Sequence, residues 1–332
     1  MQSKVQKTIE NSKVLVTGGA GFIGSNIIEK IIEQNNQVIC LDNLATGKLK
    51  NIEPFLKREN FTFINDDIRK PEVCQNACKG VDIVLHQAAL GSVPRSINDP
   101  QTTNSVNIDG FLNMLTAARD NKVKRFVYAA SSSTYGDSKN LPKIEDIIGN
   151  PLSPYAITKY VNELYAKVFS DLYDITTIGL RYFNVFGKNQ DPDGAYAAVF
   201  PKFIKALIKH EAPVIHGDGT QSRDFTYIAN VIQANELAAT TQNPEAINTV
   251  FNVAYGENNS LNELTHELIE GLSEFDKEIS NIKPTHGPTR QGDIKDSLAS
   301  IDKARTLLGY NPQYNVHQGL KKAIKWYYEN LK

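Results

Sequence analysis

Cysteine is scarce in this sequence, and the few cysteines form no recognisable disulfide or metal pattern. Cys40, Cys74 and Cys78 are the three cysteines among 332 residues. An odd, small set of this kind is typical of an intracellular protein rather than a secreted one that disulfides stabilise. Cys74 and Cys78 stand four residues apart without the second pair that a zinc site requires. We therefore expect reduced thiols, a cytoplasmic location and no bound metal.

An excess of one charge and long apolar runs are missing too. Lys and Arg number 36 against 37 Asp and Glu, a net charge of −1, so no charged surface for nucleic acid or membrane is expected. The apolar runs are far shorter than the roughly 20 residues of a membrane span. Residues 1–12 are polar, unlike a signal peptide. Apolar residues make up 41%, as in ordinary globular proteins of one or two domains.

What the sequence does contain is a glycine-rich stretch at residues 14–24. A short apolar run leads into Gly18, Gly21 and Gly24, and a helical pattern of isoleucines follows. This spacing predicts a strand, a tight turn and a helix N-terminus that receives a dinucleotide pyrophosphate. A second apolar run ends in Asp42, where a carboxylate can accept both hydroxyls of an adenosine ribose. No arginine follows Asp42 directly, which favours NAD over NADP.

Short apolar runs alternate with helical patterns through the first half of the chain. The predicted strands are 13–17, 37–41, 61–64, 81–85 and 125–130, and the predicted helices are 23–34, 71–78 and 102–120. This alternation predicts an α/β fold of the Rossmann type, a doubly wound parallel sheet covered by helices on both faces. Prolines and short loops interrupt the chain after residue 186. We expect residues 1–186 to form an NAD-binding domain with the catalytic residues, and 187–332 mainly a smaller, substrate-binding C-terminal lobe.

A second pattern concerns catalysis. Tyr155 and Lys159 follow Pro154, a helix-start signal, and share one helix face. An ammonium beside a phenol, helped by a bound nicotinamide cation, lowers the tyrosine pKa from about 10 and makes it a general base. Ser131, at the end of a predicted strand, can bond the same substrate oxygen. Alone, a Tyr-x-x-x-Lys pair is usually a solvated helix face; here it accompanies the glycine fingerprint.

The chain resembles the extended short-chain dehydrogenase/reductase superfamily. The resemblance rests on the motifs Thr17–Gly24, Ser131–Gly136, Tyr155-x-x-x-Lys159 and Arg181–Asn184. Within the superfamily the chain is similar to UDP-sugar 4-epimerases, and nearest to bacterial UDP-N-acetylglucosamine 4-epimerases through Gly91–Ser96 and Gly217–Phe225.

The resemblance implies three sets of site residues. The implied catalytic set is Ser131, Ser132, Ser133, Tyr155 and Lys159. The implied NAD contacts are Gly18, Gly21, Phe22, Ile23, Gly24, Asp42, Asn43, Thr46, Gly47, Asp67, Ile68, Gln87, Ala88, Ala89, Asn107, Tyr155, Lys159 and Tyr182. The implied UDP-sugar contacts are Ser92, Ser131, Ser133, Asn184, Val199, Lys202, Ile215, His216, Arg223, Arg290, Asp293 and Ser297.

The resemblance also narrows the reaction. Dehydratases of the superfamily carry Asp-Glu where this chain has Ser132-Ser133, and decarboxylating relatives carry Glu at Ser133. A hydroxyl protonates a leaving group poorly, which leaves epimerisation at C4 through a 4-keto sugar. Galactose-type epimerases carry a bulky tyrosine at the position of Ser297, and a serine there leaves room for a 2-N-acetyl group. We therefore expect the substrates to be UDP-GlcNAc and UDP-GalNAc. UDP-GlcNAcA/UDP-GalNAcA, UDP-glucose or UDP-glucuronate epimerisation, and a non-catalytic NAD-binding scaffold, are the alternatives.

Two helices predict a homodimer. The segments near 102–120 and 154–170 carry apolar residues on more than one face, and such helices need cover on two sides. In relatives these helices form a four-helix interface between two subunits, whereas cover by the second lobe is the alternative. The residues concerned are Phe111, Leu112, Met114, Leu115, Val161, Leu164, Tyr165, Val168 and Phe169.

Overall fold

A seven-stranded parallel sheet runs through the larger part of the computed structural model, which describes residues 7–192, 199–289 and 296–331. The strand order is β11-β6-β5-β4-β1-β2-β3, so the order reverses between β1 and β4. The predicted Rossmann-type α/β fold is confirmed. The strands are β1 (Lys13–Thr17), β2 (Gln37–Leu41), β3 (Phe61–Ile64), β4 (Ile83–His86), β5 (Arg125–Ser131), β6 (Thr177–Tyr182) and β11 (Thr249–Val253).

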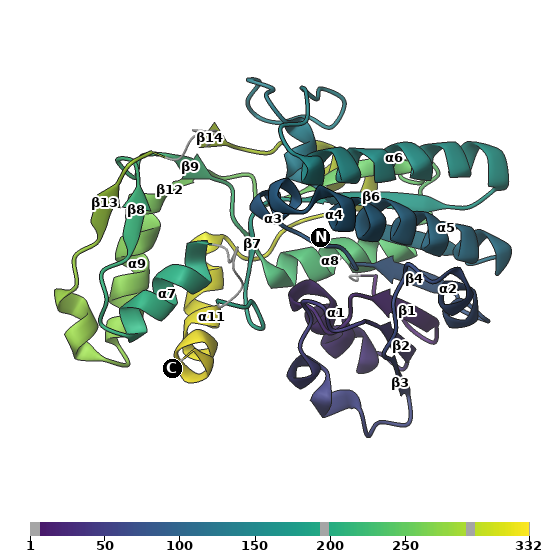
Figure 1. Ribbon diagram of the computed structural model, residues 1–332, viewed down its shortest axis with the longest axis horizontal. Helices are drawn as coiled ribbons and strands as arrows, with labels where there is room; N and C mark the ends of the chain where they lie inside the picture. Colours follow the sequence, from purple (N-terminus) through teal and green to yellow (C-terminus); the bar gives the residue numbers. More distant parts are fainter. Residues whose placement is uncertain (1–6, 193–198, 290–295, 332) are drawn as a thin grey trace, which may run out of the picture.

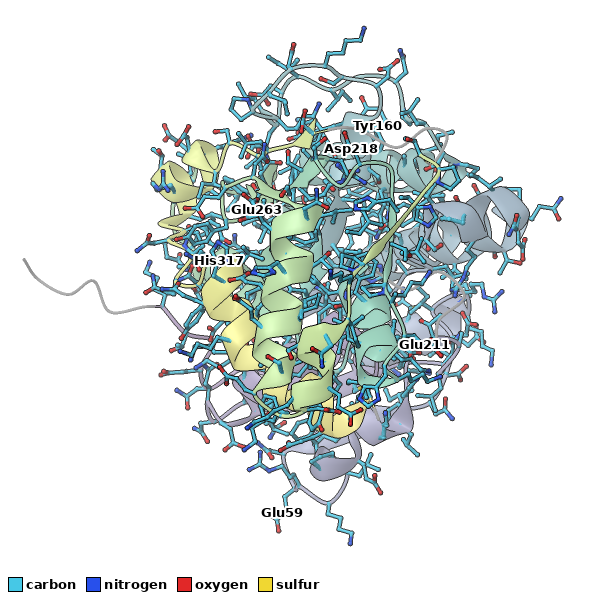
Figure 2. All side chains as sticks on the ribbon, turned by 90° about the vertical axis from the view of Figure 1, so that its left-hand side faces the viewer. Glu59, Tyr160, Glu211, Asp218, Glu263 and His317 are labelled. Atoms are coloured by element: carbon cyan, nitrogen blue, oxygen red, sulfur yellow. The ribbon has the colours of Figure 1, made fainter. Side chains whose placement is uncertain are left out.

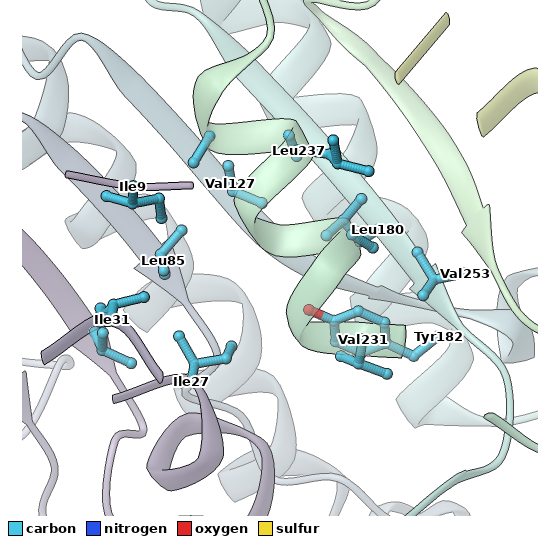
Figure 3. Packing of buried hydrophobic residues seen from close by; sticks show 14 of the residues in the cluster. Ile9, Ile27, Ile31, Leu85, Val127, Leu180, Tyr182, Val231, Leu237 and Val253 are labelled. Carbon is cyan, nitrogen blue, oxygen red and sulfur yellow. The ribbon is translucent and has the colours of Figure 1, made fainter. Parts of the chain in front are cut away.

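Helices cover both faces of this sheet (Figure 1). On one face, α1 (Phe22–Ile32) and α8 (Ile228–Thr240) enclose a core that includes Ile27, Val127 and Leu180 (Figure 3). The opposite face has its own core, which includes Leu15, Phe126 and Phe169. Because successive strand residues point to opposite faces, Val14 and Leu15 of β1 belong to different cores. The helices on the second face are α2 (Pro71–Ala77), α3 (Val93–Asn98), α4 (Pro100–Asn104), α5 (Gly110–Asp120) and α6 (Pro154–Tyr173).

The predicted helix over 102–120 is helical throughout but is not α-helical along its whole length. A π-helical turn at Ser105–Asp109 separates α4 from α5. The side chain of Asn107 in this turn bonds Leu90 and Thr158, and a Cβ on Gly110 would lie 2.6 Å from Ile68. The helix therefore changes its hydrogen bonding where it meets the end of β4 and α6. Such π turns are frequent at functional sites.

Most of the apolar residues that predict a two-sided α5 are buried within this chain. Phe111, Met114 and Leu115 are fully buried in the core of the second face. Phe169 of α6 is also buried in this core. Only Leu112 of the α5 set is partly exposed. The predicted strand over 81–85 is also shifted to Ile83–His86, because Val81 still closes the turn after α2 through its bond to Cys78.

A smaller lobe lies beside the sheet and faces the viewer in Figure 2. Its core packs three helices against one another, with Phe200, Leu268 and Tyr327 at the centre. The lobe comprises α7 (Val199–Ile208), α9 (Leu261–Ser273) and α11 (Val316–Asn330), with β8 (Val214–His216), β9 (Ser222–Arg223), β12 (Asn259–Ser260), β13 (Thr285–Gly287) and β14 (Asp296–Ser297). The other short elements are β7 (Val185–Phe186), β10 (Thr226–Tyr227) and α10 (Asp302–Leu308), with 3₁₀ turns at Leu49–Asn51, Glu53–Phe55, Ser132–Tyr135 and Lys277–Asn281.

The chain crosses between the two parts more than once. After residue 186 it enters the lobe, returns to the sheet as α8 and β11, and then re-enters the lobe at β12. A boundary at residue 186 therefore does not separate the parts in sequence. Among the described residues, no helix has the length and apolarity needed to cross a membrane.

Candidate active site

The turn between β1 and α1 is built so closely that side chains do not fit. Gly18 has a φ of +67°, and a Cβ there would lie 2.7 Å from the backbone nitrogen of Ala88. A Cβ on Gly24 would lie 2.2 Å from the carbonyl oxygen of Gly18. No side chain caps α1, and its first turn holds no acidic residue. The first N–H groups of α1 are therefore available to an anion.

A cavity of about 390 Å³ adjoins this turn at the carboxyl edge of the sheet. This is where ligands bind in open α/β sheets, next to the strand-order reversal. The predicted cofactor residues that line it are Gly18, Gly21, Phe22, Ile23, Gly24, Asp42, Asn43, Thr46, Asp67, Ile68, Gln87, Ala88 and Ala89. The glycine turn, the uncapped helix and a carboxylate at Asp42 fit a dinucleotide such as NAD.

The cofactor contacts assigned from the sequence leave out several residues of this cavity. They are Ala45, Asp66, Arg69, Leu90, Gly91, Thr102 and Val106. Asp66 follows β3 and Leu90 follows β4, so their place after a strand was a usable signal. Thr102 and Val106 come from α4 and the π turn, whose position depends on packing that no local pattern reveals.

Asp42 supports the glycine turn directly. Its carboxylate accepts hydrogen bonds from the backbone nitrogens of Ala20, at 2.9 Å, and Leu44, at 2.8 Å. Burial raises the pKa of Asp42, and the backbone N–H bonds partly offset this. Both carboxylate oxygens retain further lone pairs beside the cavity. Asp42 can therefore hold the turn and still accept hydroxyl groups from a ligand.

The neighbouring wall of the cavity is also acidic. Asp67 lies between Arg69, which contacts both of its carboxylate oxygens, and the amide of Asn43 at 2.9 Å. The hydrogen bond from Arg69 is the main reason that the pKa of Asp67 falls to about 2. Lys70 pairs with Asp66 at 2.7 Å. Both cations are thus compensated, and with Asp42 the wall keeps a net negative charge that disfavours a 2′-phosphate.

Five predicted cofactor residues are not on the cavity lining: Gly47, Asn107 and Tyr182, and the Tyr155 and Lys159 of α6 described below. Gly47 allows its loop to pass over the turn, since a Cβ would lie 2.9 Å from Asp42 Oδ2. Asn107 is buried and joins Leu90, at the end of the cavity, to Thr158 of α6. Tyr182 is mostly buried and donates to Gln87 Oε1 at 3.1 Å. The first three positions support the lining residues.

Tyr155 and Lys159 occupy the first turns of α6, as the sequence predicts. Ser153 caps this helix by accepting from the backbone nitrogen of Ala156, and Pro154 is its first residue. Tyr155 is partly buried and Lys159 almost fully buried. The ammonium of Lys159 donates to the carbonyl oxygen of Ala129 in β5 at 2.8 Å. Lys159 and Tyr155 thus both contact the end of β5, where Ser131 lies.

The predicted effect of Lys159 on Tyr155 is not found. Burial raises the pKa of Tyr155, and a hydrogen bond with Ser131 lowers it by a smaller amount. Burial also lowers the pKa of Lys159 to about 8, while the charge of Glu163 raises it. Desolvation penalises the charged form of each group and is the largest cause of both pKa shifts. The residue that favours the phenolate in this structure is Ser131.

Ser133 orients the hydroxyl of Ser131 through two hydrogen bonds. Its oxygen accepts hydrogen bonds from the Ser133 backbone nitrogen at 3.1 Å and the Ser133 hydroxyl at 2.8 Å. With its lone pairs so occupied, Ser131 is left to donate its own proton. Donation to Tyr155 agrees with the lowering of the tyrosine pKa by Ser131. Ser132, also predicted to be catalytic, is partly buried and makes no side-chain hydrogen bond within the described part of the chain.

The structure brings several predicted substrate residues together in and beside the smaller lobe. Ser297 of β14 pairs with Arg223 of β9 in a parallel register. Asn184 has a φ of 33° and donates to the carbonyl oxygen of Asp224 at 2.9 Å. Arg290 and Asp293 lie outside the described residues. Ser92 caps α3, Val199 and Lys202 begin α7, and His216 ends β8. The side chain of Ile215 is fully buried, so only its backbone can face a ligand.

Comparisons with known proteins agree over nearly the whole chain. The model of the NAD dependent epimerase/dehydratase family matches residues 14–254. A protein of Methanocaldococcus jannaschii is 39% identical over 319 residues, which cover 96% of this chain and 99% of that protein. The solved UDP-N-acetylglucosamine 4-epimerase of Methanobrevibacter ruminantium, in complex with UDP-N-acetylmuramic acid, is similar with a TM-score of 0.90 and 38% identity, covering 97% of this chain and 99% of that one. The UDP-glucose 4-epimerase of Thermotoga maritima with UDP-glucose has a TM-score of 0.87 and 34% identity, covering 96% and 100%.

Ser131→Ala tests the hydrogen bond that favours the Tyr155 phenolate. Its loss raises the tyrosine pKa, so less of the base form exists at neutral pH and the acidic limb of the rate profile moves to higher pH. Turnover at neutral pH should fall about tenfold or more, since a hydrogen bond to a charged group contributes about 1.5–3 kcal/mol. The measurement is the pH dependence of kcat. Ser170→Ala, at the far end of α6, is the matched control, and an unmoved acidic limb in Ser131→Ala would contradict this role.

Proposed function

This chain belongs to the NAD dependent epimerase/dehydratase family, and we propose that it catalyses the reversible C4 epimerisation of UDP-GlcNAc to UDP-GalNAc. The observation that carries the proposal is the set of groups around Tyr155. The positions after β5 that would supply an acid for dehydration hold the hydroxyls of Ser132 and Ser133. Tyr155 can remove a proton from a sugar hydroxyl and later return it. No group at these positions suits the expulsion of water.

The residues of the chain divide the work. The glycine turn, Asp42 and Gln87 would hold NAD, which when bound would take a hydride from C4 and return it to the opposite face. Tyr155 would take the proton of the C4 hydroxyl as hydride leaves and restore it at the end, so no net oxidation occurs. Ser131 would donate a hydrogen bond to the same substrate oxygen. Lys159, whose ammonium is held by the carbonyl oxygen of Ala129, would contact the bound NAD.

The smaller lobe would hold the UDP portion. Arg223 is partly buried on β9, and a guanidinium fork suits the oxygens of a diphosphate. Ser297 lies in register with Arg223 and has a small side chain. The small side chain at this position is the feature that supports an N-acetylated sugar. The relative from Methanobrevibacter ruminantium, named for UDP-GlcNAc and solved with another N-acetylated UDP-sugar, supports the same choice.

UDP-glucose is the second candidate. The relative from Thermotoga maritima is a UDP-glucose 4-epimerase with UDP-glucose bound, at 34% identity. UDP-sugars with a carboxylate at C6 are the third candidate substrate class. The three classes share the chemistry at C4 and differ only in the groups at C2 and C6, so direct assays separate them.

We also infer a cytoplasmic location. The three cysteines are free and buried, and burial raises the pKa of Cys74 and Cys78 to about 12. Such thiols stay protonated and unreactive. A protein without disulfides fits a reducing compartment.

The protein is further proposed to form a homodimer through α6. Ile157, Leu164, Val168 and Leu172 are between 48% and 66% exposed and lie along one side of this helix. The smaller lobe does not cover them, since α6 runs along the sheet away from the lobe (Figure 1). A second copy of α6 offers the same stripe, and a two-fold arrangement would bury both.

The proposed reaction is tested by incubating the protein with UDP-GlcNAc, UDP-glucose and UDP-GlcNAcA and separating the C4 epimers. We expect UDP-GalNAc to form fastest. Tyr155→Phe should lower kcat by about a hundredfold or more, the contribution of a general base, while the bound NAD is retained. Undiminished turnover in this variant would show that another group is the base. Preferred conversion of UDP-glucose would show that UDP-glucose, and not UDP-GlcNAc, is the substrate.

Ser297→Tyr is expected to change substrate preference. A tyrosine ring would meet the acetamido group at C2 but not a hydroxyl there, because a closed pocket is too densely packed to absorb it. The ratio of kcat/KM for UDP-GlcNAc to that for UDP-glucose should fall by about tenfold or more, a clash of about 1.4 kcal/mol. Ser280→Tyr, on an exposed turn of the lobe, is the matched control. If the ratio of the two kcat/KM values stays constant, Ser297 does not determine the preference between the two sugars.

The dimer is tested by light scattering at micromolar concentration, with an expected mass of two chains. Leu164→Glu together with Val168→Glu should yield monomers, because charges cannot be buried in an apolar interface without partners. Lys321→Glu, on an exposed face of α11, is the charge-matched control and should stay dimeric. A monomeric mass for the unaltered protein rejects the interface.

A further inference from the structure

The backbone of Gln87 is held at the end of the sheet, but this does not determine which way its side-chain amide faces. It directly follows β4, and its backbone nitrogen donates to the carbonyl oxygen of Thr17 at 3.1 Å. The next residue, Ala88, donates to the hydroxyl of Thr17 at 3.3 Å. The side chain of Gln87 lines the proposed NAD cavity. Which edge of its amide faces the cavity therefore depends on the groups around that amide.

Those groups form a closed ring of three hydrogen bonds. The Tyr182 hydroxyl donates to Gln87 Oε1 at 3.1 Å, and Gln87 Nε2 donates to Asn235 Oδ1 at 3.2 Å. Asn235 Nδ2 closes the ring by donating to the Tyr182 hydroxyl at 2.9 Å. Each member donates once and accepts once within the ring. Asn235 is 1% exposed, so water does not compete for its bonds.

One backbone atom fixes the direction of the whole ring. Asn235 Nδ2 also donates to the carbonyl oxygen of Val231, one turn earlier in α8, at 2.8 Å. A carbonyl oxygen only accepts, so this bond determines which end of the Asn235 amide is nitrogen. Oδ1 must then face Gln87, which presents Nε2 to it and turns Oε1 toward Tyr182. Figure 3 shows Tyr182 beside Val231 at this end of α8.

We propose that Asn235 is a positioning residue for NAD. Its bond to the carbonyl oxygen of Val231 fixes its own amide, which in turn orients the amide of Gln87 and the hydroxyl of Tyr182. The ring leaves one Nε2 hydrogen and one Oε1 lone pair of Gln87 for the cavity. Tyr182 remains a neutral donor, since burial raises its pKa to about 12. The inference rests on the proposed NAD site but not on the choice of sugar.

The test compares Asn235→Ala, Tyr182→Phe and the double variant, each purified as holoenzyme. The readouts are the rate at which NAD leaves the protein, and kcat and KM for UDP-GlcNAc. We expect each single change to speed NAD loss and to lower kcat, by about tenfold for a lost buried hydrogen-bonding partner. KM should not change, because Arg223 and Ser297 lie in the smaller lobe. The double variant should match Asn235→Ala, since either change breaks the same ring.

Asn230→Ala is the matched control. Asn230 is also buried on α8, but its side chain bonds the backbone of Gln313 and Tyr314. This variant should lower Tm and leave NAD loss and kcat unchanged. If Asn235→Ala likewise lowers only Tm, or if the two single effects multiply in the double variant, the proposal is overturned.

Asn235→Asp covers the case in which the alanine variant fails to fold. The aspartate side chain has the same size, but it supplies at most one hydrogen, even when protonated, where Tyr182 and Val231 require two. Faster NAD loss from this folded variant supports the proposal, and an unchanged rate overturns it. Because NAD loss needs no sugar, these outcomes stay interpretable even if the protein converts none of the UDP-sugars and the proposed function fails.

Discussion

Close contact between the β1–α1 turn and its neighbours is the constraint on which the proposed cofactor site depends. Positions 18 and 24 leave no room for a Cβ, so the backbone itself forms the surface of the cavity. Asp42 holds this backbone through Ala20 N, while the carbonyl oxygen of Ala20 accepts from Lys48 N and the Asn51 amide. The loop after β2 is thereby folded onto the turn. A parallel sheet brings the following loops to the same edge, where they complete the cavity.

Desolvation governs the protonation of the catalytic pair. Tyr155 and Lys159 lie close enough in sequence to attract each other, but burial moves the pKa of each toward the neutral form. The nearby ion pair of Arg181 and Glu163, at 2.7 Å, adds a compensated charge rather than a free one. The groups that favour the phenolate are consequently short-range hydrogen-bond donors. Ser133 is part of this arrangement because it determines which way Ser131 donates.

The sequence predicted the features that are encoded locally. The strand positions, the glycine turn and the start of α6 at Ser153–Pro154 each depend on a few neighbouring residues. The bond between Lys159 and Ala129, and the burial of Phe111 inside the fold, depend on segments that meet only after folding. The π turn around Asn107 belongs to the same class. Patterns of apolar residues show that a helix is covered, but they do not show which partner covers it.

The proposed substrate wall, formed by Arg223 and Ser297, shows that contacts between segments far apart in the sequence are equally hidden from local patterns. Arg223 and Ser297 are 74 residues apart but pair in register, and Asp224 stands at their junction. This carboxylate is fully buried and accepts from the backbone nitrogens of Tyr255 at 3.1 Å and Ala299 at 3.3 Å. Burial raises its pKa to about 7 despite these bonds. A single buried acid thus ties the strand that carries Arg223 to the segment that follows Ser297. Sugar selectivity would then depend on how firmly the wall is anchored as well as on the small side chain at its surface.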